Sequence, residues 1–373
     1  MVPYVTDEQA ELRAQVRKFL AARSPLTEVR RLMATETGYD PAVWRVMAAQ
    51  LGLQSLGISE DFGGSGPTPV ELCMVVEEMG YALIGAPFIS CALAALALQS
   101  AGAPEVTRPW LTGIASGRTV ATVCVADTSR PWSTARDGII AESEHGGWML
   151  TGRAPVVTDG VSADVLAVVA SVAGELALFL VDPTSPATLV TDQPTLDETR
   201  KLAMVDFNRS PAELVTSRGV AEIIDHVFDV AAILLSAESL GGARRALDMS
   251  VAYAGQREQF GHLIGSFQAI KHKCADMHVL VESSRSIVFY ASRLLGSPAD
   301  PHEVPAVASL AKAYCTDAFF NVAAECLQIH GGIGFTWEHD AHLFFKRASA
   351  SRLMYGEPSA HRERLVQLVG MAV

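Results

Sequence analysis

Charged residues are scarce in this sequence, and basic ones are the scarcer kind. Charged side chains make up 19% of the 373 residues, and 29 Lys and Arg against 41 Asp and Glu give a formal net charge of −12. A chain this acidic repels nucleic acid and anionic membranes, so we expect neither as a partner. Hydrophobic residues reach 49%, which excludes a disordered chain and predicts a large core. The scarcity of charge leaves apolar surface to cover, so we expect an oligomer.

Cysteine is also rare, and its distribution argues against disulfides. The six cysteines include no C-x-x-C pair, and most lie in apolar stretches typical of buried free thiols. We therefore expect a reduced, cytoplasmic protein. Residues 1–17 are polar and do not resemble a signal peptide. The charge-free run 82–98 is too short to span a bilayer and contains Pro87, so it predicts a buried helix or turn.

The common motifs for phosphate, zinc and nucleophilic chemistry are missing. No G-x-G-x-x-G follows a strand pattern, and neither a P-loop, an H-E-x-x-H nor a G-x-S-x-G occurs. His339 and His342 are spaced like a metal pair but lack a matching carboxylate, so no metal is expected. If the chain is an enzyme, an organic cofactor must supply its chemistry.

Hydrophobic periodicity divides the chain into three zones, which predict an α+β fold. The helical repeats and the short β-branched runs indicate an N-terminal α-helical domain (1–116), a middle β-barrel or sandwich domain (117–220) and a C-terminal four-helix bundle (221–373). Helical spacing covers 7–20, 41–51, 69–82, 221–257, 270–295, 305–329 and a segment after Pro358, and strand-like runs cover 119–125, 148–151, 165–170 and 176–181.

Two clusters in the C-terminal zone are candidates for ligand binding. Residues 253–268 (YAGQREQFGHLIGSFQ) place Arg257 beside an aromatic–glycine break, where a guanidinium can bind a diphosphate. Alternatively, Arg257 caps helix carbonyls and Phe260 belongs to the core. Residues 328–336 (QIHGGIGFT) carry three glycines that allow a ligand close to the backbone. The alternative is an ordinary turn at a helix C-terminus.

Together the two clusters resemble the acyl-CoA dehydrogenase family, flavoenzymes that desaturate acyl-CoA thioesters. Three further stretches support the resemblance over essentially the whole chain: 53–64 (LQSLGISEDFGG), 77–80 (EEMG) and 197–200 (DETR). The order of the three zones is also the family's order. The chain is most similar to the shorter, partner-type subunits of actinobacterial heteromeric acyl-CoA dehydrogenases.

The resemblance implies an FAD site shared between two subunits. Arg257 would hold the diphosphate, Phe260 and Gln268 would line the adenine end, and Thr158 would contact the flavin ring. Gln328, Gly331 and Gly332 would come from the neighbouring subunit. Two features depart from the family pattern: Val156 replaces a Trp, and residues 123–130 (VCVADTSR) stand where a second flavin-facing motif belongs.

The family's reaction needs a carboxylate base, and neither family position for it carries one here. One position aligns with Gly356, next to Glu357, and the other with Ala231, two helical turns before Glu238. Either Glu357 or Glu238 acts as a displaced base, or the base belongs to a partner chain. Without a catalytic role, Glu357 would be a first-turn helix carboxylate and Glu238 half of a buried ion pair.

By the same resemblance, the expected function is FAD-dependent dehydrogenation of an acyl-CoA in fatty acid or steroid side chain β-oxidation. The expected partners are a second dehydrogenase-like chain, or further copies of this one, in a tetramer, and electron-transferring flavoprotein. A flavin-free scaffold subunit and a flavin oxidase on the same fold are the alternatives.

Overall fold

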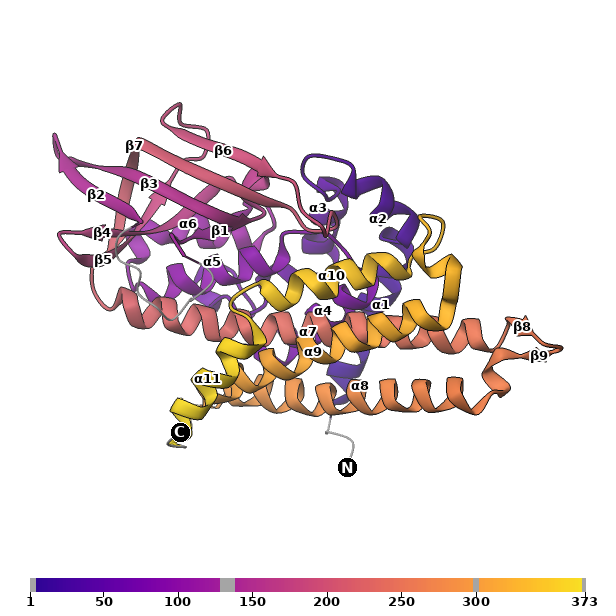
Figure 1. The fold of residues 1–373 in the computed structure, drawn as a ribbon. Helices are drawn as coiled ribbons and strands as arrows, with labels where there is room; N and C mark the ends of the chain where they lie inside the picture. Colours follow the sequence, from indigo (N-terminus) through magenta and orange to yellow (C-terminus); the bar gives the residue numbers. More distant parts are fainter. Residues whose placement is uncertain (1–4, 128–137, 298–301, 371–373) are drawn as a thin grey trace. The chain divides into compact units, whose positions relative to one another are not determined.

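The computed structural model describes residues 5–127, 138–297 and 302–370, and the chain forms two compact units. The first, here called the helical unit, comprises Met1–Val29, Val70–Ile84 and Ala232–Val373. The second, the barrel unit, comprises Arg30–Pro69 and Gly85–Ala231. The expected acyl-CoA dehydrogenase fold class, helical at both ends with a β domain between, is confirmed (Figure 1). The division into three domains stays a prediction.

The helices begin and end close to the positions that the periodicity predicts. Thr6 and Gln9 form a capping box at the first helix, and Asp40 caps the third, which ends at Gly52 with φ +62°. The α-helices are α1 (Asp7–Arg23), α2 (Leu26–Met33), α3 (Pro41–Leu51), α4 (Pro69–Ala82), α5 (Phe88–Ser100), α6 (Pro104–Ala115), α7 (Val220–Ala254), α8 (Gln268–Leu295), α9 (Val304–His330), α10 (Ala341–Leu353) and α11 (Pro358–Leu368).

Seven strands build the sheet of the barrel unit. They are β1 (Ala121–Cys124), β2 (Ile139–Glu144), β3 (Gly147–Thr158), β4 (Val165–Val172), β5 (Glu175–Val181), β6 (Thr188–Gln193) and β7 (Leu202–Thr216). β4, β2, β3, β7 and β5 pair in that order, and β5 pairs back with β4. The pairing therefore closes into a ring, with β1 added beside β4 and β6 beside β7. Of the two expected forms, this is the barrel.

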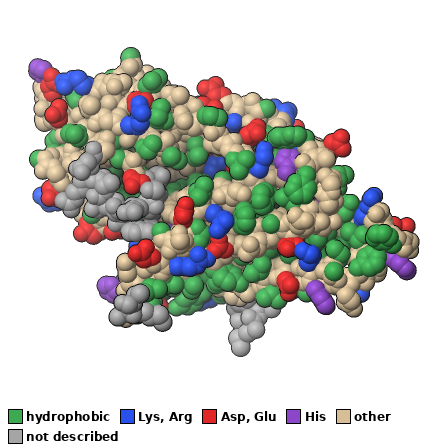
Figure 2. Space-filling model, viewed as in Figure 1, with side chains coloured by type: hydrophobic (Ala, Val, Ile, Leu, Met, Phe, Trp, Pro, Cys, Tyr) green, Lys and Arg blue, Asp and Glu red, His purple; other side chains and the backbone are tan. Residues whose placement is uncertain are grey.

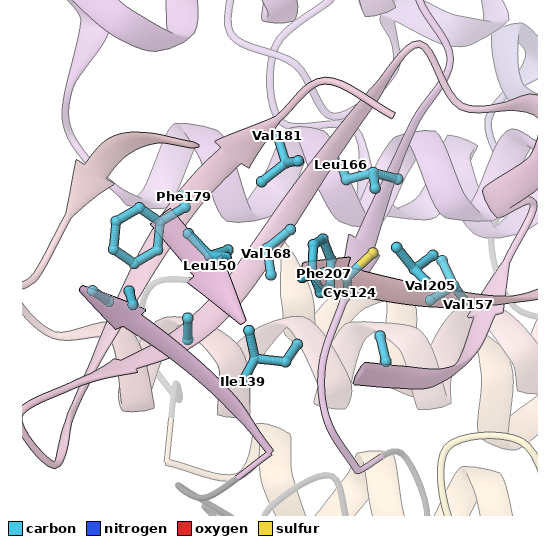
Figure 3. Close-up of a cluster of buried hydrophobic side chains, with 14 of the residues drawn as sticks. Cys124, Ile139, Leu150, Val157, Leu166, Val168, Phe179, Val181, Val205 and Phe207 are labelled. Atoms are coloured by element: carbon cyan, nitrogen blue, oxygen red, sulfur yellow. The ribbon is translucent and has the colours of Figure 1, made fainter. Parts of the chain in front are cut away.

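Side chains from several strands fill the interior of the barrel unit (Figure 3). Phe179 and Phe207 are among the largest fully buried residues, and the ring of Phe179 lies 5.5 Å from that of Trp148, centroid to centroid. Leu150 and Val168 pack in the same cluster. The β-branched and aromatic residues that predicted strands thus form a continuous apolar core.

Glycine lets two helices of the helical unit approach each other closely. A Cβ on Gly80 of α4 would lie 2.1 Å from the carbonyl oxygen of Glu238 on α7. A Cβ on Gly241 of α7 would lie 1.9 Å from the carbonyl oxygen of Glu77. Each helix therefore supplies a glycine where the other's backbone passes, and only glycine fits at either place.

The run 82–98 and the cysteines were expected to be buried. The run 82–98 leads into the buried helix α5, as expected. All six cysteines are free and five are buried, and burial raises the pKa of the Cys73, Cys91 and Cys315 thiols to about 12. These thiols are therefore protonated and unreactive at neutral pH. Within the described ranges, every helix falls short of the combined length and apolarity that a bilayer crossing requires.

Candidate active site

A short hairpin follows α7 and carries an exposed aromatic ring at its tip. Its strands are β8 (Glu258–Gln259) and β9 (His262–Leu263), and its two turn residues, Phe260 and Gly261, have φ values of +54° and +76°. Positive φ at both positions is the type I′ geometry, which favours Asn or Gly and strains Phe. The Phe260 side chain is 91% exposed, so the alternative that it belongs to this chain's core is wrong.

The hairpin projects beyond the ends of α7 and α8 (Figure 1), and hydrophobic side chains gather at this projecting end (Figure 2). The ring of Phe260 lies 6.5 Å from that of Phe267, in edge-to-face geometry. Gln268 follows directly as the exposed first residue of α8. Strain and exposure of an aromatic residue together indicate a surface made to be covered.

Arg257 lies at the foot of this hairpin. Its amide donates to the Tyr253 carbonyl at 2.9 Å, and its own carbonyl accepts from the Ile264 amide at 2.8 Å. Its guanidinium is exposed and makes no ion pair or hydrogen bond with any residue of the described ranges. The backbone thus fixes the position of Arg257 while leaving its charge available to an anion from outside the chain.

The glycine cluster lies at the C-terminal end of α9. Gly331 has φ +61°, and a Cβ on Gly331 or Gly332 would meet nothing within 4 Å, whereas one on Gly334 would lie 3.0 Å from the Leu327 carbonyl oxygen. Gln328 is exposed on the last turn of α9. The first two glycines therefore leave open space beside the backbone, and the third is required for packing.

Two stacked rings connect the hairpin to the glycine cluster. The buried His330 ring stacks on Tyr253 with centroids 4.4 Å apart, and its Nδ1 lies 2.7 Å from the Cys326 carbonyl oxygen. Burial lowers the pKa of His330, which keeps the ring neutral at physiological pH. The Tyr253 carbonyl also accepts a hydrogen bond from the Arg257 amide. The foot of the hairpin and the start of the glycine cluster are therefore held near each other within one chain.

Thr158 belongs to the barrel unit, at the end of β3. Its side chain is half-buried, and its carbonyl accepts a hydrogen bond from the Thr122 hydroxyl at 2.8 Å. The β3–β7 register shifts between Ala154 and Val157, so Val156 falls in the bulge and is 40% exposed. Part of the neighbouring stretch 123–130, namely 128–130, lies outside the described residues.

The two candidate bases occupy different environments. Glu238 is buried on α7 and accepts a hydrogen bond from Arg347 at 3.0 Å, and Arg347 is 2% exposed. The ion pair given as its alternative role is therefore present. Glu357 is exposed at the N-cap of α11, where its side chain makes no capping bond. Neither carboxylate combines burial with freedom from a basic partner, the condition for a strong base.

The chain matches known proteins both in sequence and in structure. Residues 6–118 match the model of the acyl-CoA dehydrogenase N-terminal domain, and residues 218–369 match that of the C-terminal domain. The chain is 33% identical to acyl-CoA dehydrogenase IpdE2 of Mycobacterium tuberculosis over 96% of both chains. It belongs to the acyl-CoA dehydrogenase family.

Two solved structures of named pairs of proteins share the fold of this chain. The ChsE4-ChsE5 complex from Mycobacterium tuberculosis matches with a TM-score of 0.89 at 25% identity, over 100% of both chains. A Tcur3481-Tcur3483 steroid ACAD variant matches with a TM-score of 0.86 at 27% identity, over 98% of both chains.

The acyl-CoA dehydrogenase family is generally FAD-dependent, and the hairpin region fits such a dinucleotide. Arg257 offers a guanidinium without a partner among the described residues, as a diphosphate requires. Phe260 and Phe267 offer ring faces nearby. Gly331 and Gly332 leave room for a ligand or a second chain at the backbone. Within the described residues, no group of three or more His, Cys, Asp or Glu side chains is arranged to hold a metal ion.

A buried lysine, which the motifs did not reveal, holds the turn at Gly356. Lys312 of α9 donates from Nζ to the carbonyl oxygens of Gly356 at 2.9 Å and Arg352 at 3.2 Å. Burial lowers the pKa of Lys312 to about 7. His361 donates from Nε2 to the Tyr355 carbonyl at 2.8 Å. A single lysine in the largely apolar first half of α9 was the only sequence signal, and it is a weak one.

A second set of missed residues surrounds the EEMG stretch of α4. Glu77 and Glu78 are buried, and Arg244 of α7 pairs with both. Arg13 and Arg17 of α1 pair with Glu77 and Glu78 respectively, each at 2.9 Å. This network joins three helices, so the two glutamates of EEMG serve helix packing and charge pairing.

Proposed function

We propose that this chain takes part in the FAD-dependent α,β-dehydrogenation of an acyl-CoA thioester. The observation that carries the proposal is the exposed Arg257, which has no partner among the described residues, at the foot of a strained aromatic hairpin. Membership of the acyl-CoA dehydrogenase family supports it. A chain that kept only the fold would have no need of this arrangement.

Each residue of the proposed cofactor site has a physical role. Arg257 would bind the diphosphate, while Phe260 and Gln268 would pack against the adenine end. Gln328, Gly331 and Gly332 would reach a cofactor held chiefly by a neighbouring subunit, and Thr158 would hydrogen-bond the flavin ring. FAD held by these residues would supply the acceptor for the hydride that leaves the β-carbon of the thioester.

The catalytic base is proposed to belong to a partner chain in a heterotetramer. Removal of the weakly acidic α-proton needs a carboxylate in a dry pocket. Here Glu238 is paired with Arg347 and Glu357 is exposed, which leaves neither suited to the task. The two-chain relatives ChsE4-ChsE5 and Tcur3481-Tcur3483 support a heteromeric assembly.

The proposed substrate is the acyl-CoA of a steroid side chain or a fatty acid, and the steroid ACAD among the matched structures favours the former. Electron-transferring flavoprotein is the proposed electron acceptor, and the cytoplasm the proposed location. These assignments follow from the family and its relatives rather than from a particular contact.

Flavin counting tests the cofactor proposal. The chain is purified alone and together with a co-expressed dehydrogenase-like chain encoded nearby, and FAD is counted per assembly by absorbance after denaturation. We expect flavin in the two-chain assembly. Colourless protein in both preparations would contradict the proposal and favour a scaffold, while rapid peroxide formation without an electron acceptor would indicate an oxidase.

Single-turnover bleaching of the flavin tests where the base lies. Glu357→Gln and Glu238→Gln are compared with the unmodified two-chain assembly, with circular dichroism to confirm folding. We expect neither Glu357→Gln nor Glu238→Gln to slow flavin reduction by more than about threefold. Loss of the true general base would slow it by about 10²–10⁴-fold. Slowing by that larger factor in either variant would place the base in this chain.

A further inference from the structure

The helical unit contains a pocket that the proposed cofactor site does not use. It has a volume of about 340 Å³, and it lies where the end of α1 and the start of α2 meet α4 and α7. Every lining residue belongs to the helical unit. We call this hollow the α1–α2 pocket, and its key lining residues are Arg17, Leu20, Ser24, Glu78, Tyr81 and Arg245.

Ser24 gives the α1–α2 pocket an unsatisfied polar wall. This residue caps the C-terminus of α1 and is only 5% exposed, yet its hydroxyl has no hydrogen-bond partner among the described residues. A buried hydroxyl without a partner costs about 1–3 kcal/mol. Since Ser24 is one of the residues that line a pocket large enough for a small molecule, a ligand bound there can supply the missing bond.

The start of α2 adds hydrogen-bond donors beside Ser24. Leu26 and Thr27 line the pocket and form the first turn of this eight-residue helix, where amides have no acceptor within the helix. Pro25, which precedes them, has no amide hydrogen to compete for an acceptor. The positive end of the helix dipole favours a negative group at this place.

Arg245 provides a positive charge without an acidic partner. Its guanidinium lies over the Tyr81 ring, 5.2 Å from the centroid, and no carboxylate of the described ranges forms an ion pair with it. The neighbouring Arg244, by contrast, pairs with both Glu77 and Glu78. The planar, weakly hydrated guanidinium of Arg245 is suited to bind a carboxylate at the edge of the pocket.

The other charges of the pocket limit the charge of its ligand. Arg17 binds Glu78 through two hydrogen bonds of 2.9 Å, so these two lining residues neutralise each other. Burial opposes ionisation of Glu78, but the hydrogen bond from Arg17 and the charge of Arg244 outweigh it and hold the Glu78 pKa below its usual value. Asp340 is a further acidic lining residue. One uncompensated arginine fits a monoanion better than a dianion.

We propose that the α1–α2 pocket binds a small amphipathic monocarboxylate. Its carboxylate would accept hydrogen bonds from the Ser24 hydroxyl, the first turn of α2 and Arg245. Its apolar part would pack on Leu20, Ala21 and Ala82, which form part of the apolar lining. This site is separate from the hairpin and glycine residues assigned to FAD, so the proposal does not depend on the dehydrogenation.

Ligand-observed fluorine NMR tests the proposal on the purified full-length protein. Fluorobenzoate is the probe, and the neutral fluorobenzyl alcohol is its matched analogue. We expect fluorobenzoate to bind with a dissociation constant of about 1 mM or tighter, and the alcohol at least about tenfold more weakly, because the carboxylate makes charge-assisted bonds. Equal binding of the two probes, or no binding of fluorobenzoate, would overturn the proposal.

Three variants place the bound probe. Arg245→Gln should weaken binding about tenfold or more, since it removes a charge-assisted contact. Arg293→Gln is the matched control, because Arg293 also lies over an aromatic ring, that of Phe289, but on α8. Ala21→Phe, on the exposed side of α1, should fill the pocket and abolish binding. Unchanged binding in both Arg245→Gln and Ala21→Phe would show that the probe binds elsewhere.

Ser24→Ala separates a binding role from a structural one. Removing the unpaired hydroxyl should raise the melting temperature of the ligand-free protein while it weakens fluorobenzoate binding about three- to tenfold. A purely structural Ser24 would leave the affinity unchanged, which would contradict its assigned role. Displacement of the probe by equimolar inorganic phosphate would contradict the preference for a monoanion.

Discussion

Two regions of the helical unit use glycine and arginine for opposite purposes. At the α4–α7 crossing, Gly80 and Gly241 are closed in by backbone atoms, and Arg244 is bound by two buried carboxylates. In the cluster after α9, a Cβ on Gly332 would meet nothing within 4 Å, and Arg257 of the nearby hairpin has no partner among the described residues.

The difference lies in what surrounds each residue, not in the residue type. A side chain whose hydrogen bonds and contacts are complete within the chain contributes to stability. One that the fold positions but leaves incomplete is available to a ligand or a second chain. Substitutions in the closed crossing should therefore change unfolding, and substitutions in the open region should change binding.

The largest effect is expected at Glu78. Glu78→Gln should lower the free energy of unfolding by about 3–5 kcal/mol, because it removes the buried carboxylate that Arg17 and Arg244 share. The measurement is urea unfolding followed by circular dichroism. Glu282→Gln is the control, since Glu282 is exposed and pairs with Arg285 only across one helical turn. Equal losses of stability in the two variants would show that the buried, paired carboxylate of Glu78 contributes no more to folding than an exposed one.

Arg257→Ala should have the next largest effect, on cofactor binding rather than on folding. Loss of a charge-assisted diphosphate contact is expected to weaken FAD binding by about 1.5–3 kcal/mol, or roughly one to two decades in affinity. Flavin retention by the two-chain assembly during dilution measures this, with Arg293→Ala as the exposed control. Retention equal to that of the control would contradict the assignment of Arg257.

Gly241→Ala is expected to cost about 1–3 kcal/mol of stability, since its methyl group would be forced against the backbone of α4. The open counterpart is Gly332→Ala, which meets no neighbouring atom and should unfold at nearly the same temperature as the unmodified chain. Thermal unfolding of both variants makes the comparison. A larger loss of stability at Gly332 than at Gly241 would reverse it.

The smallest effect concerns pH and the closed turn between α10 and α11. Burial lowers the pKa of His361 from 6.5 to about 4, so the folded chain holds this ring neutral where the unfolded chain protonates it. His361 therefore stabilises the fold above pH 6.5, and this contribution is lost as pH falls toward 4. Between pH 7 and pH 5 the loss is about 2 kcal/mol, at 1.36 kcal/mol per pKa unit.

His361→Asn should make the melting temperature less sensitive to acid over that interval. The control is His278→Asn, because His278 is exposed on α8. If His361→Asn and the unmodified chain lose the same stability between pH 7 and pH 5, another group carries the dependence.

Sequence periodicity predicted the helices that have clear capping and breaking residues. The ranges 41–51 and 69–82 coincide with α3 and α4, because Pro begins each helix and glycine ends α3. The predicted helix 221–257 is wrong at its end: α7 stops at Ala254, and the chain turns into the hairpin. Periodicity could not detect this, since the turn depends on positive φ at Phe260 and Gly261.

Other elements were missed for identifiable physical reasons. α10 buries Arg347 against Glu238, so a charged residue occupies a position where a pattern search requires an apolar one. β7 contains Pro211, which in a sequence indicates a break in a strand. The strand is also irregular at Arg209, whose φ is +58°. The partner that compensates Arg347, Glu238, lies more than a hundred residues earlier in the sequence.

The candidate site was predictable only where its residues lie in compact motifs. Arg257 and the glycines at 331 and 332 were selected from local sequence, and their cofactor role stays a prediction. Ser24, Arg245 and Lys312 carry no local motif, because what distinguishes each is the presence or absence of a partner in space.

The glycines of the α4–α7 crossing also determine which genetic changes could repair them. A methyl group at Gly80 or Gly241 meets main-chain atoms, which no second substitution removes. At the adjacent Gly242 it would meet the ring of Phe319, a side chain that a smaller residue can replace. A suppressor screen should therefore recover second-site changes at Phe319 for Gly242→Ala, but only true revertants for Gly241→Ala.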